Sequence, residues 1–207
     1  MAGASVSAAT LRVYVSGDAA ARALGADAVA QGIASRASAA GRGLQIVRTG
    51  SRGMVWAEPL IEIETGGARI AYGPVQLRDL DGLFAARFLE GGAHALRLGQ
   101  VERLPWFARQ ERLTFALCGH CDPLDYDAWR AAGGLAGVEK ALEMTPAAIV
   151  QAVTDSGLRG RGGAAFPTGR KWQTVAAQEA TERFIVCNAD EGDSGTFSDR
   201  MLMEGDP

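Results

Sequence analysis

Residues 157–171, GLRGRGGAAFPTGRK, combine glycines with four cationic side chains, a proline and a phenylalanine. Glycine has no Cβ atom, so bare backbone N–H groups at this density can approach a flat or anionic ligand closely. The arginines and Lys171 supply positive charge for phosphate groups, and the ring of Phe166 offers a face for stacking. These residue types indicate a nucleotide-binding loop; the alternative is a flexible surface loop.

Two common phosphate-binding motifs do not fit this loop. Gly160, Gly162 and Ala165 have the spacing of the dinucleotide fingerprint, but that fingerprint follows a strand, and residues 146–156 look helical. A P-loop requires Gly-Lys followed by Ser or Thr, whereas residues 169–172 read GRKW. The type of nucleotide site therefore stays open at this point.

A second segment with binding chemistry lies near the C-terminus. Residues 183–188, RFIVCN, are typical of a short β-strand, and they lead directly into ADEGDSGT at 189–196. Open α/β folds place ligand contacts in loops that follow strands. We therefore expect a ligand-binding loop here; the alternative is a set of turn and capping roles for its Asp and Asn side chains.

Composition excludes several classes of protein. The 207 residues are 47% hydrophobic and 22% charged, which suits one large or two small globular domains. A net charge of −3 without a basic stripe argues against a nucleic-acid partner. No apolar run is long enough to cross a bilayer, residues 1–10 do not resemble a secretory signal, and three cysteines are too few for a disulfide scaffold. We expect a cytoplasmic protein without a membrane span.

The first 90 residues predict a small α/β domain. Asp18 is placed to cap an alanine-rich helix that ends near Gly41, and Gly66-Gly67 are placed to turn a hairpin. The predicted elements, in order, are a strand at 11–15, a helix at 19–41, a strand at 44–48, hairpin strands at 59–64 and 69–73, and a helix near 78–89. This order is that of a thioredoxin-like domain.

This first domain resembles the thioredoxin-fold ferredoxin domains that accompany NADH-oxidising flavoprotein subunits, by its element order and by the wording GSRGMVWAEPLIEIE and RIAYGPV. In those domains, cysteines after the first and second strands hold a [2Fe–2S] cluster. Here the corresponding loops, 15–18 and 49–54, contain no cysteine, and thiolate ligation is impossible without one. We therefore expect a docking or spacer domain without [2Fe–2S].

The following region is less regular. Residues 91–113 carry Gly91-Gly92, Pro105 and scattered charges, which predicts a linker. Cys118 and Cys121 then match the CGHC motif of disulfide isomerases. Because the thioredoxin-like unit has already ended and further metal ligands are scarce, we expect two reduced thiols rather than a redox or metal site. Helices are expected at 135–144, at 146–156 with Thr145 as its cap, and at 172–178.

Residues 157–172 and 186–207 together closely resemble the FMN- and NADH-binding core of one family. The family comprises the flavin subunits of respiratory complex I, of NAD-reducing hydrogenases and of NAD-dependent formate dehydrogenases. The resemblance is detailed from about residue 115 onward and looser before it. A cluster-free thioredoxin-like domain ahead of the flavin domain is most similar to the β subunit of a molybdenum-type formate dehydrogenase. The diaphorase subunit of a soluble hydrogenase is the alternative.

This resemblance implies FMN as prosthetic group and NADH or NAD⁺ as substrate, with hydride passing between the nicotinamide and the flavin. The flavin carries the chemistry, so no side chain is predicted to be catalytic. Electrons would pass to iron–sulfur and catalytic subunits of a larger complex. The residues implied to bind the flavin are Gly160, Arg161, Gly162, Gly163, Lys171, Asn188, Asp190 and Glu191. Those implied to bind NADH are Phe166, Lys171 and Asp193.

The chain also departs from the family pattern. The family generally has glycine at the position of Ala165, and glutamate then proline at Asp193-Ser194. In the family the flavin domain continues further and is followed by a ubiquitin-like domain and a helical domain with a [4Fe–4S] cluster. The resemblance therefore divides the chain into a thioredoxin-like domain at 1–90, a linker at 91–113 and the first part of an FMN-binding domain at 114–207. We expect these residues alone to bind FMN poorly and to show no NADH oxidation.

Overall fold

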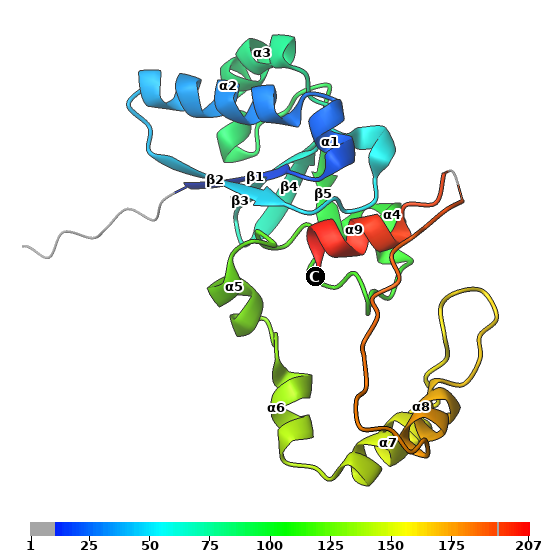
Figure 1. Cartoon of the computed structure of the whole chain (residues 1–207). Coiled ribbons are helices and arrows are strands. Elements are labelled where there is room, and N and C mark those ends of the chain that lie inside the picture. The colour runs from blue at the N-terminus through cyan, green and yellow to red at the C-terminus, as the bar shows by residue number, and fades with distance from the viewer. Residues whose placement is uncertain (1–10, 194) are drawn as a thin grey trace, which may run out of the picture. The chain divides into compact units, whose positions relative to one another are not determined.

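The computed structural model describes residues 11–193 and 195–207 and has a mixed α/β fold (Figure 1). It divides into two compact units. The first contains the described residues up to Trp129 together with the C-terminal segment from Ala189, and the second contains Arg130–Asn188. The chain thus leaves the first unit and later returns to it.

The first unit is built on a single five-stranded sheet in the order β2-β1-β3-β4-β5. β1 and β2 are parallel, with Leu11 opposite Leu44, and every other neighbouring pair is antiparallel. The predicted strands at 11–15 and 44–48 form, and so does the hairpin turned by Gly66-Gly67. The strands are β1 (Leu11–Ser16), β2 (Leu44–Thr49), β3 (Ile61–Thr65), β4 (Ala68–Tyr72) and β5 (Arg97–Gln100).

Helices on one face of this sheet enclose the main core (Figure 1). Asp18 caps α1 (Ala19–Ala23) by accepting a hydrogen bond from the Ala21 N–H at 3.1 Å, as its position predicts. The single helix expected at 19–41 is two helices, because Gly25 takes a left-handed φ of 99° before α2 (Ala26–Ala39) begins. Apolar side chains of α2, α3 (Leu80–Ala85) and the strands fill the core, among them Val13, Ile33, Ile63 and Leu80, together with Phe88 beyond α3.

The sheet extends into the stretch that the sequence predicts to be a linker. β5 pairs with β4, and the turn η4 (Val101–Arg103) and the short helix α4 (Pro105–Ala108) follow it. Val101 is fully buried in a second apolar cluster with Met54 and Leu60, against which Phe107 packs. Residues 97–107 are therefore part of the folded unit. Other single-turn segments are η1 (Val55–Ala57), η2 (Leu77–Asp79) and η3 (Phe88–Glu90).

A buried ion pair links the loop after β2 to β3. The guanidinium of Arg52 donates two hydrogen bonds to the carboxylate of Glu62, and both side chains are less than 5% exposed. Arg69 lies 3.5 Å from the same carboxylate and donates to the backbone carbonyls of Gly119 and His120. These contacts attach the CGHC loop to the sheet.

The C-terminal helix α9 (Ser198–Gly205) packs on the same unit. The side chain of Glu204 accepts a hydrogen bond from the Ala19 N–H at 2.9 Å, and that of Asp206 accepts one from the Leu117 N–H at 2.8 Å. A Cβ atom built on Gly50 would lie 2.3 Å from the Cα atom of Gly205. The two backbones therefore touch where only glycine fits.

A buried carboxylate lies between the loops that follow β1 and β2. The hydroxyls of Ser16 and Ser51 each donate to Glu58 at 2.9 Å, and the Leu60 N–H donates to it at 2.8 Å. Burial raises the pKa of Glu58 to about 7; the three hydrogen bonds oppose this rise, and the nearby carboxylate of Asp18 adds to it.

The second unit consists of helices, of which α7 and α8 pack against each other. Thr145 caps α7 by accepting a hydrogen bond from the Ala148 N–H, and Pro146 occupies the first helical position, as predicted. A Cβ atom on Gly169 would lie 2.6 Å from the Cα atom of Thr154. The helices are α5 (Tyr126–Ala131), which spans the boundary between the units, α6 (Ala136–Leu142), α7 (Pro146–Asp155) and α8 (Thr168–Ala176).

The strand expected at 183–188 does not form. Phe184, Ile185 and Val186 are 83%, 101% and 84% exposed. A strand needs a neighbour that accepts its backbone hydrogen bonds, and no described segment pairs with this one. The apolar composition of residues 183–188 favours burial, but apolar side chains are buried only where another surface packs against them.

Within the described residues, no helix has both the length and the apolar character needed to cross a membrane.

Substituting Glu58→Gln is expected to change how stability depends on pH. The folded-state pKa of about 7 lies above the unfolded value of 4.5, so the contribution of Glu58 to stability falls as pH rises from about 4.5 to 7 and is lost above that. The stability of Glu58→Gln relative to wild type should therefore rise between pH 5 and 8 by about 3 kcal/mol. Urea unfolding at both pH values measures this, with the exposed Glu111→Gln as control. Parallel pH profiles for wild type and Glu58→Gln would contradict the assignment.

Substituting Gly169→Ala is expected to destabilise the second unit, because the new methyl group overlaps the backbone of Thr154. Overpacking of this kind costs about 1–3 kcal/mol. Gly137→Ala is the matched control: both glycines are the second residue of a helix, but a Cβ atom on Gly137 meets nothing within 4 Å. Amide hydrogen exchange in α7 should become faster in Gly169→Ala and not in Gly137→Ala. Equal exchange in the two variants would show that the close approach is not required.

Candidate functional site

The glycine loop of residues 157–171 is closed at its base by backbone contacts. The Gly160 N–H donates to the Phe166 carbonyl at 2.8 Å, the Thr168 N–H donates to the Leu158 carbonyl at 2.9 Å, and Arg159 forms a β-bridge with Pro167. Residues 161–165 form the tip. The loop is thus an ordered hairpin-like turn between α7 and α8, which holds its backbone ready for a ligand.

The tip presents bare backbone. Cβ atoms built on Gly162 and Gly163 would meet nothing within 4 Å, and Gly163 has a φ of 100°. A Cβ atom on Gly160 would lie 3.2 Å from the Lys171 ammonium nitrogen, which itself lies 6.0 Å from the centre of the Phe166 ring. The structure therefore brings Gly160, Phe166 and Lys171 together and leaves the glycine-rich tip open. Arg161 is exposed beside them.

Ala165 occupies a backbone conformation that favours glycine. Its φ is 51°, in the left-handed region where a Cβ atom is strained. Its carbonyl accepts a hydrogen bond from the Arg159 guanidinium at 2.9 Å. The departure from the family pattern noted in the sequence thus falls where the backbone itself calls for glycine, so the added methyl group has a conformational cost.

The acidic loop is ordered by Glu191. Its carboxylate accepts hydrogen bonds from the Asp199 N–H at 2.9 Å, the Arg200 N–H at 3.1 Å and the Ser198 hydroxyl at 3.2 Å, at the start of α9. Desolvation raises the pKa of Glu191, but these hydrogen bonds outweigh it, so the pKa lies below its ordinary value. Glu191 therefore attaches the loop to α9. The sequence does not reveal this role, because the partners of Glu191 begin seven residues further along the chain.

The remaining predicted residues of this segment are accessible. Asn188, Asp190 and Asp193 are exposed, and the Asp193 carbonyl accepts a hydrogen bond from the Thr196 N–H at 3.2 Å, which forms a turn. Ser194 lies outside the described residues. Asn188 ends the second unit, whereas Asp190, Glu191 and Asp193 belong to the first. The glycine loop and most of the acidic loop therefore belong to different units.

The surroundings of the CGHC loop disfavour the thiolate form of its cysteines. Cys118 is buried, and burial raises the pKa of its thiol to about 11; the pKa of Cys121 is also raised by burial. A thiol protonated at neutral pH is a weak nucleophile. Desolvation and the Arg52 and Arg69 guanidinium groups lower the pKa of His120 to about 4. The described residues contain no group of three or more His, Cys, Asp or Glu side chains suited to a metal ion.

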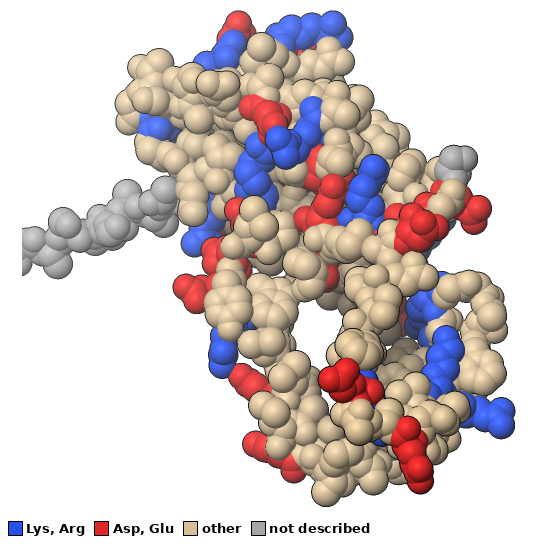
Figure 2. Space-filling model, viewed as in Figure 1, with Lys and Arg blue, Asp and Glu red and all other residues tan. Residues whose placement is uncertain are grey.

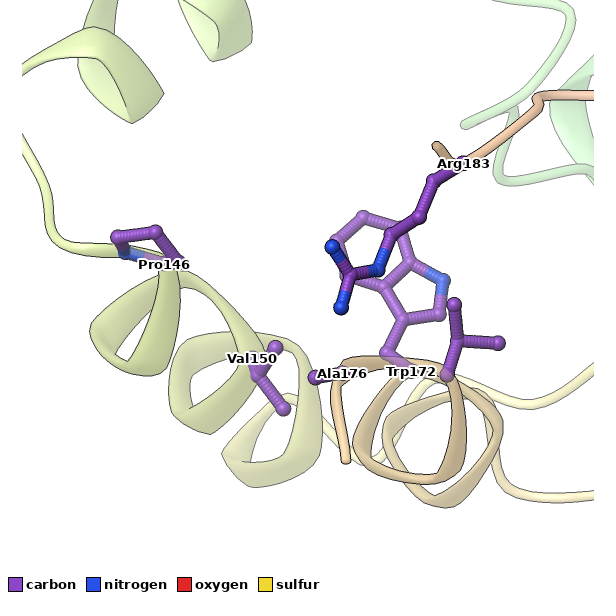
Figure 3. Close-up of a pocket in the computed structure, with 6 residues that line it drawn as sticks. Pro146, Val150, Trp172, Ala176 and Arg183 are labelled. Atoms are coloured by element: carbon purple, nitrogen blue, oxygen red, sulfur yellow. The ribbon is translucent and has the colours of Figure 1, made fainter. Parts of the chain in front are cut away.

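An apolar hollow between α7 and α8 escaped the sequence reading. It measures about 440 Å³ and contains Val150 of α7, Trp172 and Ala176 of α8, and Arg183 beyond α8 (Figure 3). Pro146 and Val175 complete its lining. The apolar spacing on each helix predicts only that one face of the helix is buried. In the packed pair, part of the apolar face of each helix is left uncovered and lines the hollow.

Charges of both signs are mixed over the surface. On the face shown in Figure 2, Lys and Arg alternate with Asp and Glu among the described residues without a continuous basic stripe. This agrees with the net charge of −3. The four cations of the glycine loop are thus a local feature.

Comparison with known proteins identifies the C-terminal segment. Residues 153–207 match the family described as the Nuo51 FMN-binding domain. The chain is 50% identical over 99 residues to the NADP-reducing hydrogenase subunit HndC of Solidesulfovibrio fructosivorans, which covers 48% of this chain and 20% of the relative. It is 45% identical over 94 residues to an NADH-quinone oxidoreductase subunit of Escherichia coli, covering 44% and 21%. The predicted resemblance to this flavoprotein family is confirmed.

Another relative is the NAD-reducing hydrogenase HoxS subunit alpha of Cupriavidus necator, 43% identical over 70 residues, which covers 34% of this chain and 12% of the relative. The chain therefore spans about a fifth or less of the length of these relatives. The crystal structure of a NAD⁺-reducing [NiFe]-hydrogenase aligns with this chain at 27% identity and a TM-score of 0.33. The alignment covers 94% of this chain and 32% of the hydrogenase chain. That score is too low to relate the folds.

Substituting Ala165→Gly is expected to relieve strain in the glycine loop. Removing the methyl group from a left-handed position gains about 1 kcal/mol, which offsets the usual cost of a more flexible glycine. Ala164→Gly is the matched control, since Ala164 carries no such strain and should only lose stability. Hydrogen exchange of the Gly160 and Thr168 amides measures loop opening, and Ala165→Gly should exchange about five times more slowly than Ala164→Gly. Exchange that is equal, or faster in Ala165→Gly, would contradict the strain.

Proposed function

Because residues 153–207 match the Nuo51 FMN-binding domain, we propose that this chain is part of a flavin subunit that exchanges hydride between NADH or NAD⁺ and FMN. The observation that carries the proposal is the ordered glycine loop with its open backbone and adjacent Lys171. The relatives are subunits of a NADP-reducing hydrogenase, of NADH-quinone oxidoreductases and of a NAD-reducing hydrogenase.

The residues of the glycine loop fit a flavin mononucleotide. Gly162 and Gly163 leave the backbone open to a flat ring system, and a side chain at either position would extend into that space. Lys171 and Arg161 place positive charge beside the loop for a phosphate or a flavin oxygen. Gly160 carries no side chain that would displace Lys171. We therefore assign flavin binding to Gly160, Arg161, Gly162, Gly163 and Lys171.

The acidic loop supplies polar contacts of the opposite charge. Asn188 and Asp190 are exposed and suited to hydrogen bonds with hydroxyl groups of the flavin side chain. Glu191 contributes by holding this loop against the start of α9, since both of its carboxylate oxygens accept hydrogen bonds there. We thus retain Glu191 in the flavin site as the residue that positions Asp190.

NADH is assigned to Phe166, Lys171 and Asp193. The exposed Phe166 ring offers a stacking surface for an adenine or nicotinamide ring, and Lys171 lies beside it. Asp193 stands in an exposed turn from which it can bond a ribose hydroxyl. Bound FMN would supply the hydride and single-electron chemistry. The carboxylates of the acidic loop would disfavour additional negative charge beside them.

Residues 1–90, which belong to the first unit, are proposed to form a thioredoxin-like domain without an iron–sulfur cluster. Its support is the order β2-β1-β3-β4 with β1 and β2 parallel and the β3–β4 hairpin antiparallel. Ser16 at the end of β1 and Ser51 in the loop after β2 donate hydrogen bonds to Glu58. We propose a division at 1–90, 91–113 and 114–207, in which the middle segment is not a free linker, because residues 97–107 fold with the sheet.

The larger complex is proposed to contain iron–sulfur subunits and a catalytic subunit that oxidises a different substrate. A formate dehydrogenase, with formate and NAD⁺ giving CO₂ and NADH, is favoured by the resemblance of the first domain. A hydrogenase or complex I-type assembly fits the relatives equally well. A [4Fe–4S] cluster is expected only in protein regions that correspond to later parts of the relatives.

FMN binding by the ¹⁵N-labelled chain tests this function. FMN at millimolar concentration should shift amide resonances in both 157–171 and 188–196, even though its affinity for these residues alone is expected to be weak. Gly162→Val should weaken binding at least tenfold by filling the open backbone. Gly43→Val is the matched control, because a Cβ atom there also meets nothing within 4 Å.

Two outcomes would count against the proposal. Shifts that are absent or spread evenly over the chain would favour a docking module without flavin. Shifts confined to one loop would show that the two loops do not share a ligand. Riboflavin in place of FMN separates ring binding from phosphate binding, since the cations of the glycine loop should favour FMN.

A further inference from the structure

A second hollow lies within the first unit, in a region to which the proposed flavin chemistry assigns no role. It measures about 510 Å³, within the range of small-molecule sites. It is formed by the loop after β2, the end of α4 with residues 110–115, and the start of α9. Three aromatic side chains line it: Trp106, Phe115 and Phe197. Trp106 and Phe197 are 46% and 45% exposed.

Three charged residues line this hollow, Arg52, Glu111 and Arg112, and Arg112 differs from the other two in its surroundings. Its guanidinium lies 4.3 Å from the centre of the Phe107 ring and donates hydrogen bonds to the Arg52 carbonyl at 2.7 Å and to the Gln110 side chain at 3.1 Å. Desolvation and the neighbouring Arg52 lower the pKa of Arg112. Its surroundings thus disfavour a positive charge, yet arginine stays charged at neutral pH.

No carboxylate among the described residues lies within ion-pair distance of Arg112. The residues outside the described ranges, 1–10 and 194, contain no Asp or Glu. Arg52 offers a contrast, because it forms a buried ion pair with Glu62. Glu111 also lines the hollow, but it forms no ion pair with Arg112. A half-buried cation without a counter-ion is costly, and an anion in the hollow would offset that cost.

From this juxtaposition of aromatic walls and an unneutralised guanidinium, we propose that the hollow binds a small aromatic carboxylate. The aromatic body contacts Trp106 and Phe197, and the carboxylate pairs with Arg112. Guanidinium and carboxylate groups match in geometry as well as charge. This site is lined by none of the residues assigned to FMN or NADH, and it meets them at Ser198, whose hydroxyl donates to Glu191.

Binding of 2-naphthoate to the whole ¹⁵N-labelled chain tests the proposal, with the neutral 2-naphthylmethanol as matched ligand. Naphthoate should shift amides at 106–115 and 197–201 and bind at least tenfold more tightly than naphthylmethanol. Arg112→Gln should remove that preference while leaving naphthylmethanol binding unchanged. Arg109 is an exposed arginine at the end of α4, and Arg109→Gln should change neither the preference for naphthoate nor the affinity for naphthylmethanol. Thermal unfolding verifies that the variants fold.

If Arg112→Gln fails to fold, Trp106→Ala serves instead, since Trp106 is half-exposed and should be replaceable. This substitution should lower the affinity for both ligands by a similar factor. In the wild type, added salt should lower the affinity for naphthoate and leave the affinity for naphthylmethanol unchanged. Equal affinity for the two ligands would overturn the proposal. So would shifts confined to the apolar hollow between α7 and α8, or a naphthoate preference that survives Arg112→Gln.

Discussion

One buried glutamate, Glu62, links several loops of the first unit to its sheet. Glu62 points from β3 toward two arginines, and through them it fixes three separate segments: the loop after β2, β4 and the CGHC loop. Arg112 is attached in turn through the backbone carbonyl of Arg52. A buried ion pair contributes little net stability by itself, but removing one member leaves an uncompensated charge. The arrangement of these loops therefore depends on Glu62 being satisfied.

The sequence predicted the local architecture of the first unit well. The predicted strands agree with β1 to β4, and Asp18 caps α1 as expected, because capping depends on neighbouring backbone groups. The same holds for Thr145 in the second unit. Elements that depend on distant partners were predicted less well. Residues 97–100 form β5 because β4 offers a free edge, whereas the more apolar 183–188 has no strand to pair with among the described residues.

The candidate site shows the same division. The glycine loop is a local turn, so its residue types alone predict an open, positively charged backbone. The role of Glu191 was hidden, because the backbone groups that it binds lie seven or more residues further along the chain. The hollow around Arg112 combines segments from three parts of the chain, and the absence of a counter-ion there is a property of the packed structure. No spacing rule reveals such an absence.

The two candidate loops are ordered independently of each other. Backbone contacts close the glycine loop within the second unit, and Glu191 and α9 fix the acidic loop within the first. A loop that is disordered before binding must be ordered by its ligand, and the cost of ordering lowers the affinity. Because hydrogen bonds within the chain already order each of these loops, a ligand at either one would spend little of its binding energy on ordering the backbone.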